Sequence, residues 1–286
     1  MCKRVIYYLC WAFLFIACQE IPQEETPGEI VVEGWIEAGA GPVVMLSRTF
    51  VVSTGKETAE EQSIVLSLAK VEVSDGTRSV TLTGDYDDRY FPPFIYSTSK
   101  IRGVPGRTYR LTVEYEGSVV TAETTIPEPA SLDALEVSPC AHLDSVYQIT
   151  AHFGDNPETK DYYLFLTRIF NRENRFYPST FGVIDDATLA EHNNEHVVHP
   201  GIHMLTSDRH TYGLYFLDTD SVQIKFARVD ETTYNIHKAF HEMVILNNNP
   251  LFASDVSMPT NIQGGLGFWC GYAATKYNVV IADSIR

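Results

Sequence analysis

The sequence predicts a mainly β fold, with an N-terminal immunoglobulin-like β-sandwich followed by a β-rich mixed domain that contains at least one helix. Residues 30–126 repeat short alternating runs rich in β-branched residues, and turn signals separate these runs. Pro127-Glu128-Pro129 then breaks the pattern, since a central strand does not tolerate proline. Residues 131–286 mix strand patterns with one helical pattern, so we expect the second domain there.

Residues 1–17 are expected to be a lipoprotein signal peptide. Lys3 and Arg4 give a basic start, residues 5–16 are almost wholly apolar, and Ala17 is the small residue required before a cleavage site. The apolar run is shorter than the roughly 20 residues that a membrane-spanning helix needs. The end of this segment resembles the bacterial lipobox, so we expect Cys18 to be acylated. The alternative is ordinary secretion with cleavage near Ala17.

Residues 18–29 are expected to form an acidic tether. The segment holds several glutamates with prolines and a glycine, and such a composition cannot bury a core. It resembles the acidic stretch that follows the lipidated cysteine in surface-exported lipoproteins of Bacteroidetes-type bacteria. The alternative is a plain acidic linker. We therefore expect a lipid-anchored protein of the outer membrane that faces the cell exterior.

The charge of the chain argues against one class of partner. The 286 residues include 37 acidic and 21 basic side chains, for a formal net charge of −16. Loss of Lys3 and Arg4 with the signal peptide would make the mature chain more acidic still. Phosphate backbones repel such a polyanion, so nucleic acid is not an expected partner.

Cys140 and Cys270 remain once the signal peptide is removed and Cys18 is acylated. Their compartment would allow one disulfide between them, but two lone cysteines are just as often buried apolar residues. Their spacing does not decide between the two.

The first part should form about seven strands, the number typical of an immunoglobulin-like sandwich. Glu116-Gly117 is a two-residue hairpin turn between the last two strands, and Tyr109, Leu111 and Val113 should share one face of the first of them. The clearest of these strands are residues 30–36, 43–47, 70–73, 79–83, 108–115 and 118–124.

In the second part, one helix should run to about Leu246 with Asp230 or Thr232 as its N-cap, and Asn247 to Pro250 should end it. The strands that we expect there are residues 132–137, 147–153, 162–170, 222–229 and 277–281.

Four motifs occur along the chain in a characteristic order: residues 31–36 (VVEGWI), 161–164 (DYYL), 249–252 (NPLF) and 261–269 (NIQGGLGFW). With them the chain resembles the domain of unknown function 4249 family. The resemblance implies an outer-membrane lipoprotein of Bacteroidetes-type bacteria. Members are commonly encoded beside TonB-dependent transporters, which implies a surface accessory that delivers or retains a substrate for import. The resemblance implies no catalytic residues.

The glycine-rich motif offers candidate contact residues. Gly264, Gly265 and Gly267 would let backbone approach a ligand or partner closely, with Trp269 beside them. A tight turn with a bulge that feeds the last strand explains the same residues, and we favour this interpretation.

The histidines are the clearest candidates for metal ligands. His192, His196, His199 and His203 have a spacing that would bring two or three rings together on a helix, and a transition metal is the only cofactor that we consider. A histidine-rich surface loop is the alternative, since Asn193-Asn194 and Pro200-Gly201 break helices. His237 and His241 lie on the expected helix, but Lys238 occupies the place of the zinc-protease glutamate, so we expect a packing or solvated role.

An aromatic segment is the best candidate for a contact surface. Tyr90, Phe91, Phe94 and Tyr96 lie near prolines, and rigid aromatic anchors are what binding loops use. Aromatic side chains that close one end of the sandwich core would give the same pattern.

Together these features favour a non-catalytic, lipid-anchored accessory protein that binds a substrate or partner, with a TonB-dependent transporter as the expected partner. The alternatives are a metal-dependent or carbohydrate-active surface enzyme and a structural adhesion module. No catalytic constellation is visible in the sequence, so the binding protein ranks first.

Overall fold

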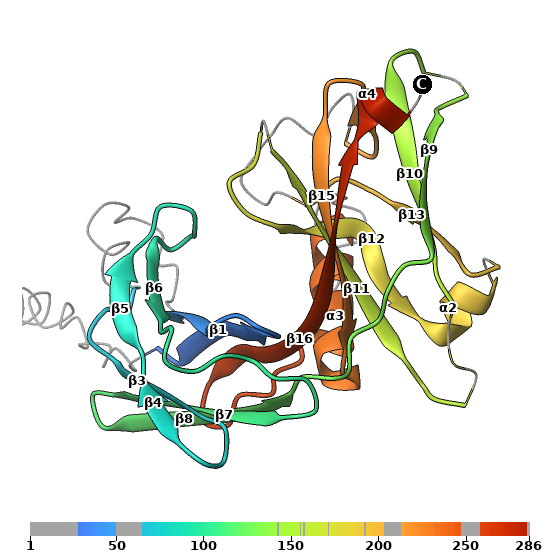
Figure 1. The fold of residues 1–286 in the computed structure, drawn as a ribbon. Helices are drawn as coiled ribbons and strands as arrows, with labels where there is room; N and C mark the ends of the chain where they lie inside the picture. The colour runs from blue at the N-terminus through green and yellow to red at the C-terminus, as the bar shows by residue number, and fades with distance from the viewer. Residues whose placement is uncertain are drawn as a thin grey trace, which may run out of the picture.

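The computed structural model describes residues 28–49, 65–141, 143–154, 156, 158–170, 172–191, 193–202, 213–246 and 258–284. In these ranges the chain is mainly β, as predicted, and it forms two β-rich halves that share one long sheet (Figure 1). Cys18, most of the acidic tether, His192 and His203 lie outside the described residues.

The first half is a two-layered sandwich. One layer runs in the order β1-β2-β6-β5, and the other is a separate sheet in the order β4-β3-β7-β8. The expected strand 79–83 is in fact two strands, β4 and β5, which lie in different layers. The strands are β1 (Ile30–Glu37), β2 (Val43–Arg48), β3 (Lys70–Ser74), β4 (Ser79–Thr81), β5 (Thr83–Tyr86), β6 (Phe94–Ser97), β7 (Thr108–Tyr115) and β8 (Ser118–Thr125).

The β7–β8 hairpin forms as the sequence predicts. Tyr109, Leu111 and Val113 of β7 are buried between the layers, while their neighbours on the strand are more exposed. Glu116 and Gly117 form the turn, with φ of 49° and 82°. Positive φ at both central residues gives a turn whose twist matches that of the flanking strands. Local sequence alone therefore sets this element.

The C-terminal strand joins the two halves. β16 (Leu266–Val280) pairs in parallel with β1 and in antiparallel with β15 (Ser221–Val229). One eight-stranded sheet results, in the order β12-β11-β15-β16-β1-β2-β6-β5. Figure 1 shows β16, in dark red, rising from beside β1 into the second half. The strand expected at residues 277–281 is only the end of this long strand, and residues 30–126 share their core with it.

A second layer covers the large sheet in the other half. The smaller sheet has β10 at its centre, paired with β9, β13 and β14. Phe153, Phe165 and Phe226 fill the core between the two layers. The remaining strands are β9 (Ala134–Pro139), β10 (Val146–His152), β11 (Tyr162–Ile169), β12 (Tyr177–Asp185), β13 (Glu195–Val198) and β14 (Phe216–Leu217), and the short helices are α2 (Asp186–Glu191) and α4 (Ile281–Ser284).

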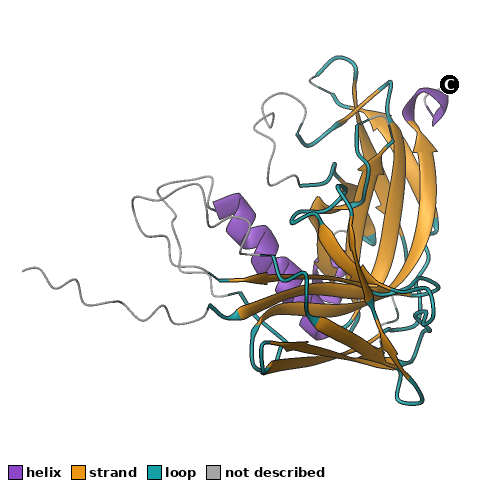
Figure 2. Cartoon of the chain, turned by 90° about the vertical axis from the view of Figure 1, so that its left-hand side faces the viewer, coloured by secondary structure: helices purple, strands orange, loops and turns teal. Residues whose placement is uncertain are grey.

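Helix α3 (Glu231–Leu246) packs on the opposite face of the large sheet (Figure 2). The Asp230 side chain accepts a hydrogen bond of 2.7 Å from the Thr233 backbone N–H, so the predicted N-cap is confirmed. Tyr234 and Ile236 are buried against Cys270 and its neighbours on the sheet. None of the helices that the structure describes is both long enough and apolar enough to span a bilayer.

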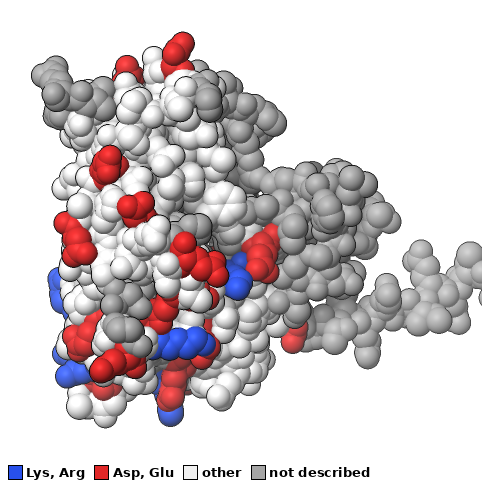
Figure 3. Space-filling view, turned by 90° about the vertical axis from the view of Figure 1, so that its right-hand side faces the viewer, with Lys and Arg blue, Asp and Glu red and all other residues white. Residues whose placement is uncertain are grey.

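The surface carries mostly negative charge. On the face drawn in Figure 3, the Lys and Arg side chains lie among Asp and Glu side chains and form no separate basic patch. Surface pairs of this kind, such as Arg110 with Glu123 at 2.5 Å and Lys70 with Glu114 at 3.1 Å, contribute little to stability.

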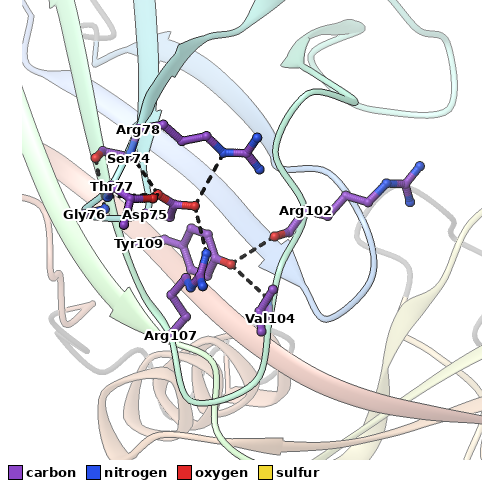
Figure 4. Close-up of polar contacts among 9 residues, drawn as sticks. All are labelled: Ser74, Asp75, Gly76, Thr77, Arg78, Arg102, Val104, Arg107 and Tyr109. Carbon is purple, nitrogen blue, oxygen red and sulfur yellow. Dashed lines mark hydrogen bonds and ion pairs between the residues drawn. The ribbon is translucent and has the colours of Figure 1, made fainter.

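Polar contacts of Tyr109 and Asp75 fasten the start of β7 (Figure 4). The Tyr109 hydroxyl donates to the Arg102 carbonyl and accepts from the Val104 N–H, both at 2.9 Å. A tyrosine that bonds back to the chain just upstream is a device of immunoglobulin-like sandwiches. The buried Asp75 carboxylate accepts from the Thr77 hydroxyl at 2.7 Å and pairs with Arg107 at 2.9 Å. These contacts hold the β3–β4 turn against the loop that precedes β7.

Candidate functional site

The side chains of β1 divide between two faces of the large sheet. Val32 and Ile36 enter the sandwich core. Because side chains alternate along a strand, Glu33, Trp35 and Glu37 point to the opposite face, where α3 packs. Trp35 packs against the cluster of apolar residues beneath α3. Two carboxyl groups and a tryptophan thus lie on one face at the point where the halves join.

Loops from both halves meet over this face. Tyr90, between β5 and β6, has its ring centroid 6.0 Å from that of Trp35, with 40° between the planes. Arg175, just before β12, places its guanidinium carbon 5.5 Å from the Tyr90 ring and 4.8 Å from the Tyr177 ring. We call Glu33, Trp35, Tyr90 and Arg175 the bridged site, because the contact between Tyr90 and Arg175 links the two halves.

Not every polar group of the bridged site has a hydrogen-bond partner. Among the described residues, the buried Nε of Arg175 has no hydrogen-bond partner. Burial raises the pKa of Glu33, and the nearby charge of Arg175 offsets part of this effect. A buried donor without an acceptor costs free energy, and native proteins keep few of them. Arg175 as a whole is only partly buried and donates no hydrogen bond to the described residues, so its guanidinium has hydrogen-bonding capacity that a bound molecule would satisfy.

The neighbouring charges, by contrast, are paired. Glu37 forms ion pairs with Lys225 and, at 3.6 Å, with Lys276. Burial lowers the pKa of Lys225, while the carboxylate of Glu37 acts in the opposite direction. The Lys225 ammonium also lies 4.5 Å from the Phe176 ring. Burying a charge is costly unless it is paired, so this network stabilises the joint between the halves.

The predicted aromatic contact residues separate into two groups. Tyr90 belongs to the bridged site, and Phe91 beside it is 67% exposed. Tyr96 is buried in the sandwich, where its hydroxyl donates to the Leu66 carbonyl at 2.6 Å. The ring of Phe94 packs edge-on against Tyr96 at 5.4 Å. Phe94 and Tyr96 therefore help to close the core, which is one of the two roles considered from the sequence, while the contact role of the segment stays a prediction.

The glycine-rich motif packs closely against the backbone of β1. Gly264 and Gly267 have φ of +82° and +99°, and a Cβ on Gly267 would lie 1.9 Å from the Val32 carbonyl oxygen. A Cβ on Gly265 would lie 2.6 Å from the Ile30 carbonyl oxygen. The absence of a Cβ at these glycines lets the backbone of β16 and its preceding turn approach the backbone of β1.

Trp269 is also an internal residue. Its side chain is fully buried in the sandwich core, and its indole N–H donates to the Tyr109 carbonyl at 3.0 Å. The structure thus places Trp269 in the core, and Gly265 and Gly267 support β16 through their close approach to β1, whereas Gly264 is exposed.

The predicted histidine ligands do not converge in the part of the chain that the structure describes. The His196 ring stacks on Phe165 at 5.0 Å, and His199 Nδ1 lies 2.8 Å from the Leu214 carbonyl oxygen. No three His, Cys, Asp or Glu side chains gather there in a way that would hold a metal ion. His192 and His203 lie outside the described residues.

The two helical histidines of α3 have packing contacts. His237 is buried, with its Nε2 at 2.8 Å from the Tyr272 hydroxyl, and burial lowers its pKa to about 4. His241 Nε2 accepts a hydrogen bond of 3.2 Å from the Phe181 N–H. Of the packing and solvated roles expected for this pair, these contacts favour packing.

The disulfide considered from the sequence does not form. Cys140 and Cys270 are both free thiols. Cys270 on β16 is buried beneath α3, and burial raises its pKa to about 12. Cys140 instead follows β9, in the layer on the other side of the large sheet. The sheet itself separates them.

A depression of about 490 Å³ lies where the linker crosses the second half. Four of its charged groups are already paired with one another. Lys160 lies 3.0 Å from Glu231, and Arg228 pairs with Asp161. Because these groups satisfy one another, we consider the bridged site the stronger candidate. The depression is lined by Pro127, Glu128, Lys160, Asp161, Tyr162, Arg228, Val229, Asp230 and Glu231.

Sequence reasoning missed three members of the bridged site: Glu33, Trp35 and Arg175. One signal was available in the sequence. Glu33 and Trp35, with Glu37 just after them, alternate with core residues in the strand expected at residues 30–36. The face that they share can be covered by another part of the protein instead of by solvent. No local pattern marks Arg175.

Comparison with known proteins gives one match. The model of a family described as Domain of unknown function (DUF4249) matches residues 19–278, which include both halves and every residue of the bridged site. No curated protein matches the chain.

Proposed function

The chain belongs to the domain of unknown function 4249 family, and on this premise we propose that it is a non-catalytic binding protein of the outer membrane. Acylation of Cys18 anchors it, and the acidic tether holds the folded part away from the bilayer, on the cell exterior. It binds a substrate or partner there and works with a TonB-dependent transporter.

One observation carries the binding role. The bridged site has a buried guanidinium N–H without a partner beside a desolvated carboxyl group, between the rings of Trp35, Tyr90 and Tyr177. Binding sites combine apolar and aromatic walls with a few polar groups in fixed positions. The contact between Tyr90 and Arg175 also joins loops of both halves, so a bound molecule would touch both.

The anchoring role agrees with the charge of the folded part. The acidic surface suits a protein that stands clear of anionic headgroups and is held by its acyl chains instead. Two or more acyl chains hold a protein on a bilayer stably, whereas one chain does so only marginally.

A pull-down from the native outer membrane tests this proposal. The tagged lipoprotein is extracted in mild detergent, its partners are identified by mass spectrometry, and the metal content of the eluate is measured. We expect a TonB-dependent transporter in near-equal amount and no stoichiometric metal. A partner-free protein that carries zinc or iron would refute the proposal.

The Cys18→Ser variant is the control for anchoring. We expect it to lose the acyl chains, measured by mass spectrometry of the N-terminal peptide, and to leave the membrane fraction. A variant that stays acylated and membrane-bound would show that the anchor lies elsewhere.

A further inference from the structure

We propose that the bridged site binds a neutral saccharide. This inference rests on the proposed function, because it names the class of molecule that the binding protein takes. It is carried by the hydrogen-bonding groups, the aromatic rings and the charges of the site.

The first argument is the pairing of donors and acceptors. Arg175 and Glu33 are close enough for the charge of one to affect the other, and no hydrogen bond contributes to the pKa shift of Glu33. Within the described residues, the partly buried guanidinium of Arg175 donates no hydrogen bond. A hydroxyl group is both donor and acceptor, so adjacent hydroxyls of a sugar would satisfy both groups at once.

The second argument is the shape of the aromatic wall. The rings of Trp35 and Tyr90 lie 6.0 Å apart at 40°, and both side chains are partly exposed. Two rings at an open angle present flat apolar surface next to the polar groups. A pyranose ring has the matching character, with an apolar C–H face and hydroxyl groups around its edge.

The third argument is charge. The carboxyl group of Glu33 is desolvated, and Arg175 is the cation that faces it. A charged ligand would add another charge to a site with poor solvation, which is costly unless each charge finds a partner. An anion would also meet the field of a chain with a net charge of −16. A neutral ligand avoids both costs.

Tryptophan fluorescence of the full acylated protein in detergent provides the measurement. Trp11 lies in the expected signal peptide, so the mature chain holds Trp35 and Trp269. Because Trp269 is fully buried in the sandwich core, a ligand at the bridged site should change the emission of Trp35. The probes are neutral oligosaccharides of glucose, mannose, xylose and galactose, with calorimetry to measure the dissociation constant.

Two arginine variants form a matched pair. Arg175→Met removes the unpaired donor, and we expect it to weaken binding by about tenfold or more. Arg89→Met is the control, since Arg89 also lies over the Tyr90 ring, at 5.9 Å, but its guanidinium is paired with Asp87 at 2.5 Å. We expect this variant to bind as the wild type does.

Two further variants keep the test decisive if Arg175→Met folds poorly. Glu33→Gln replaces a carboxylate of the site by an uncharged amide of the same shape, so it should weaken the binding of a neutral sugar by less than Arg175→Met does. Trp35→Phe should remove the fluorescence change and weaken binding in calorimetry. Thermal unfolding confirms that each variant is folded.

The outcomes separate the two proposals. Sugar binding that Arg175→Met weakens by about tenfold or more and Arg89→Met leaves unchanged supports the inference. Binding of amino acids or short peptides in place of sugars, lost in Glu33→Gln, would overturn the saccharide assignment. So would the absence of sugar binding while the pull-down still yields the transporter, a result that leaves the proposed function in place.

Discussion

Single residues fix the geometry of the first half through buried polar contacts. Asp75 shows this best, because the Thr77 hydroxyl and two backbone N–H groups donate to its carboxylate, and Arg107 pairs with it. The hydrogen bond from Thr77 is the main reason why the pKa of Asp75 lies well below its usual range. A carboxylate that is satisfied in this way joins a turn to a distant loop without leaving a buried charge unpaired.

Two glycines with positive φ lead to a prediction about single residues. Gly267 and Gly76 both have positive φ, but a Cβ on Gly267 would lie 1.9 Å from the Val32 carbonyl oxygen, whereas a Cβ on Gly76 would meet nothing within 4 Å. We expect Gly76→Ala to lower the free energy of unfolding by about 1 kcal/mol, from backbone strain alone. Gly267→Ala should cost about 3 kcal/mol or more, because it also separates β16 from β1.

Chemical denaturation of both variants checks this prediction. Equal losses of stability would mean that the close approach of β16 to β1 is readily relieved, and the glycine motif would then need an explanation outside the fold.

At the scale of elements, helix α3 depends on a histidine that must stay neutral. His237 is buried beside Tyr272, and burial lowers its pKa to about 4. In the unfolded chain a histidine has a pKa of about 6.5, so the unfolded state takes up a proton first as the pH falls. Stability should therefore decrease between about pH 6.5 and pH 4 and level off below that.

His237→Gln tests this pH dependence. The wild type should lose about 3 kcal/mol more than the variant between pH 6.5 and pH 4, measured by denaturation at each pH. Tyr272→Phe is the companion, since it removes the hydroxyl partner but leaves His237 buried. Because burial is the cause of the shift, this variant should keep the acid sensitivity of the wild type. An identical pH profile for the wild type and His237→Gln would contradict the assignment.

Elements with strong local signals were predictable from the sequence. The β7–β8 hairpin has strict alternation and a Glu-Gly turn, and α3 has a capping aspartate followed by apolar residues at helical spacing. β16 was not predictable at its true length. Residues 266–276 mix glycine, alanine and aromatic residues without alternation, because β16 lies within the large sheet and contacts the cores of both halves. Its parallel partner β1 is at the other end of the described chain, where periodicity gives no information.

At the scale of the whole molecule, the long sheet explains why the bridged site escaped sequence analysis. Tyr90 and Arg175 belong to loops of different halves, and they meet only because β16 aligns β1 with β15. The cluster of aromatic residues near Tyr90 was visible in the sequence and predicted a contact surface. Arg175 had no such signal, since its role depends on a contact that the topology creates.

The same sheet leads to a prediction about cooperativity. Trp269 and Ala273 of β16 lie in the sandwich core, while Val279 of the same strand lies in the core of the second half. A strand shared by two cores should make them unfold together. We therefore expect Leu111→Ala, in the first core, and Ile149→Ala, in the second, each to destabilise the entire molecule by about 2 to 5 kcal/mol.

Hydrogen exchange followed by mass spectrometry distinguishes this from two independent units. If the halves unfold together, each variant lowers the protection of the most stable amides in β7 and β11 by the same amount. If the linker at Pro127 separates independent domains, Leu111→Ala lowers protection in β7 alone and Ile149→Ala in β11 alone. The coupled result would mean that a molecule bound at the bridged site, which contacts both halves, stabilises the whole chain by the full linkage free energy of binding.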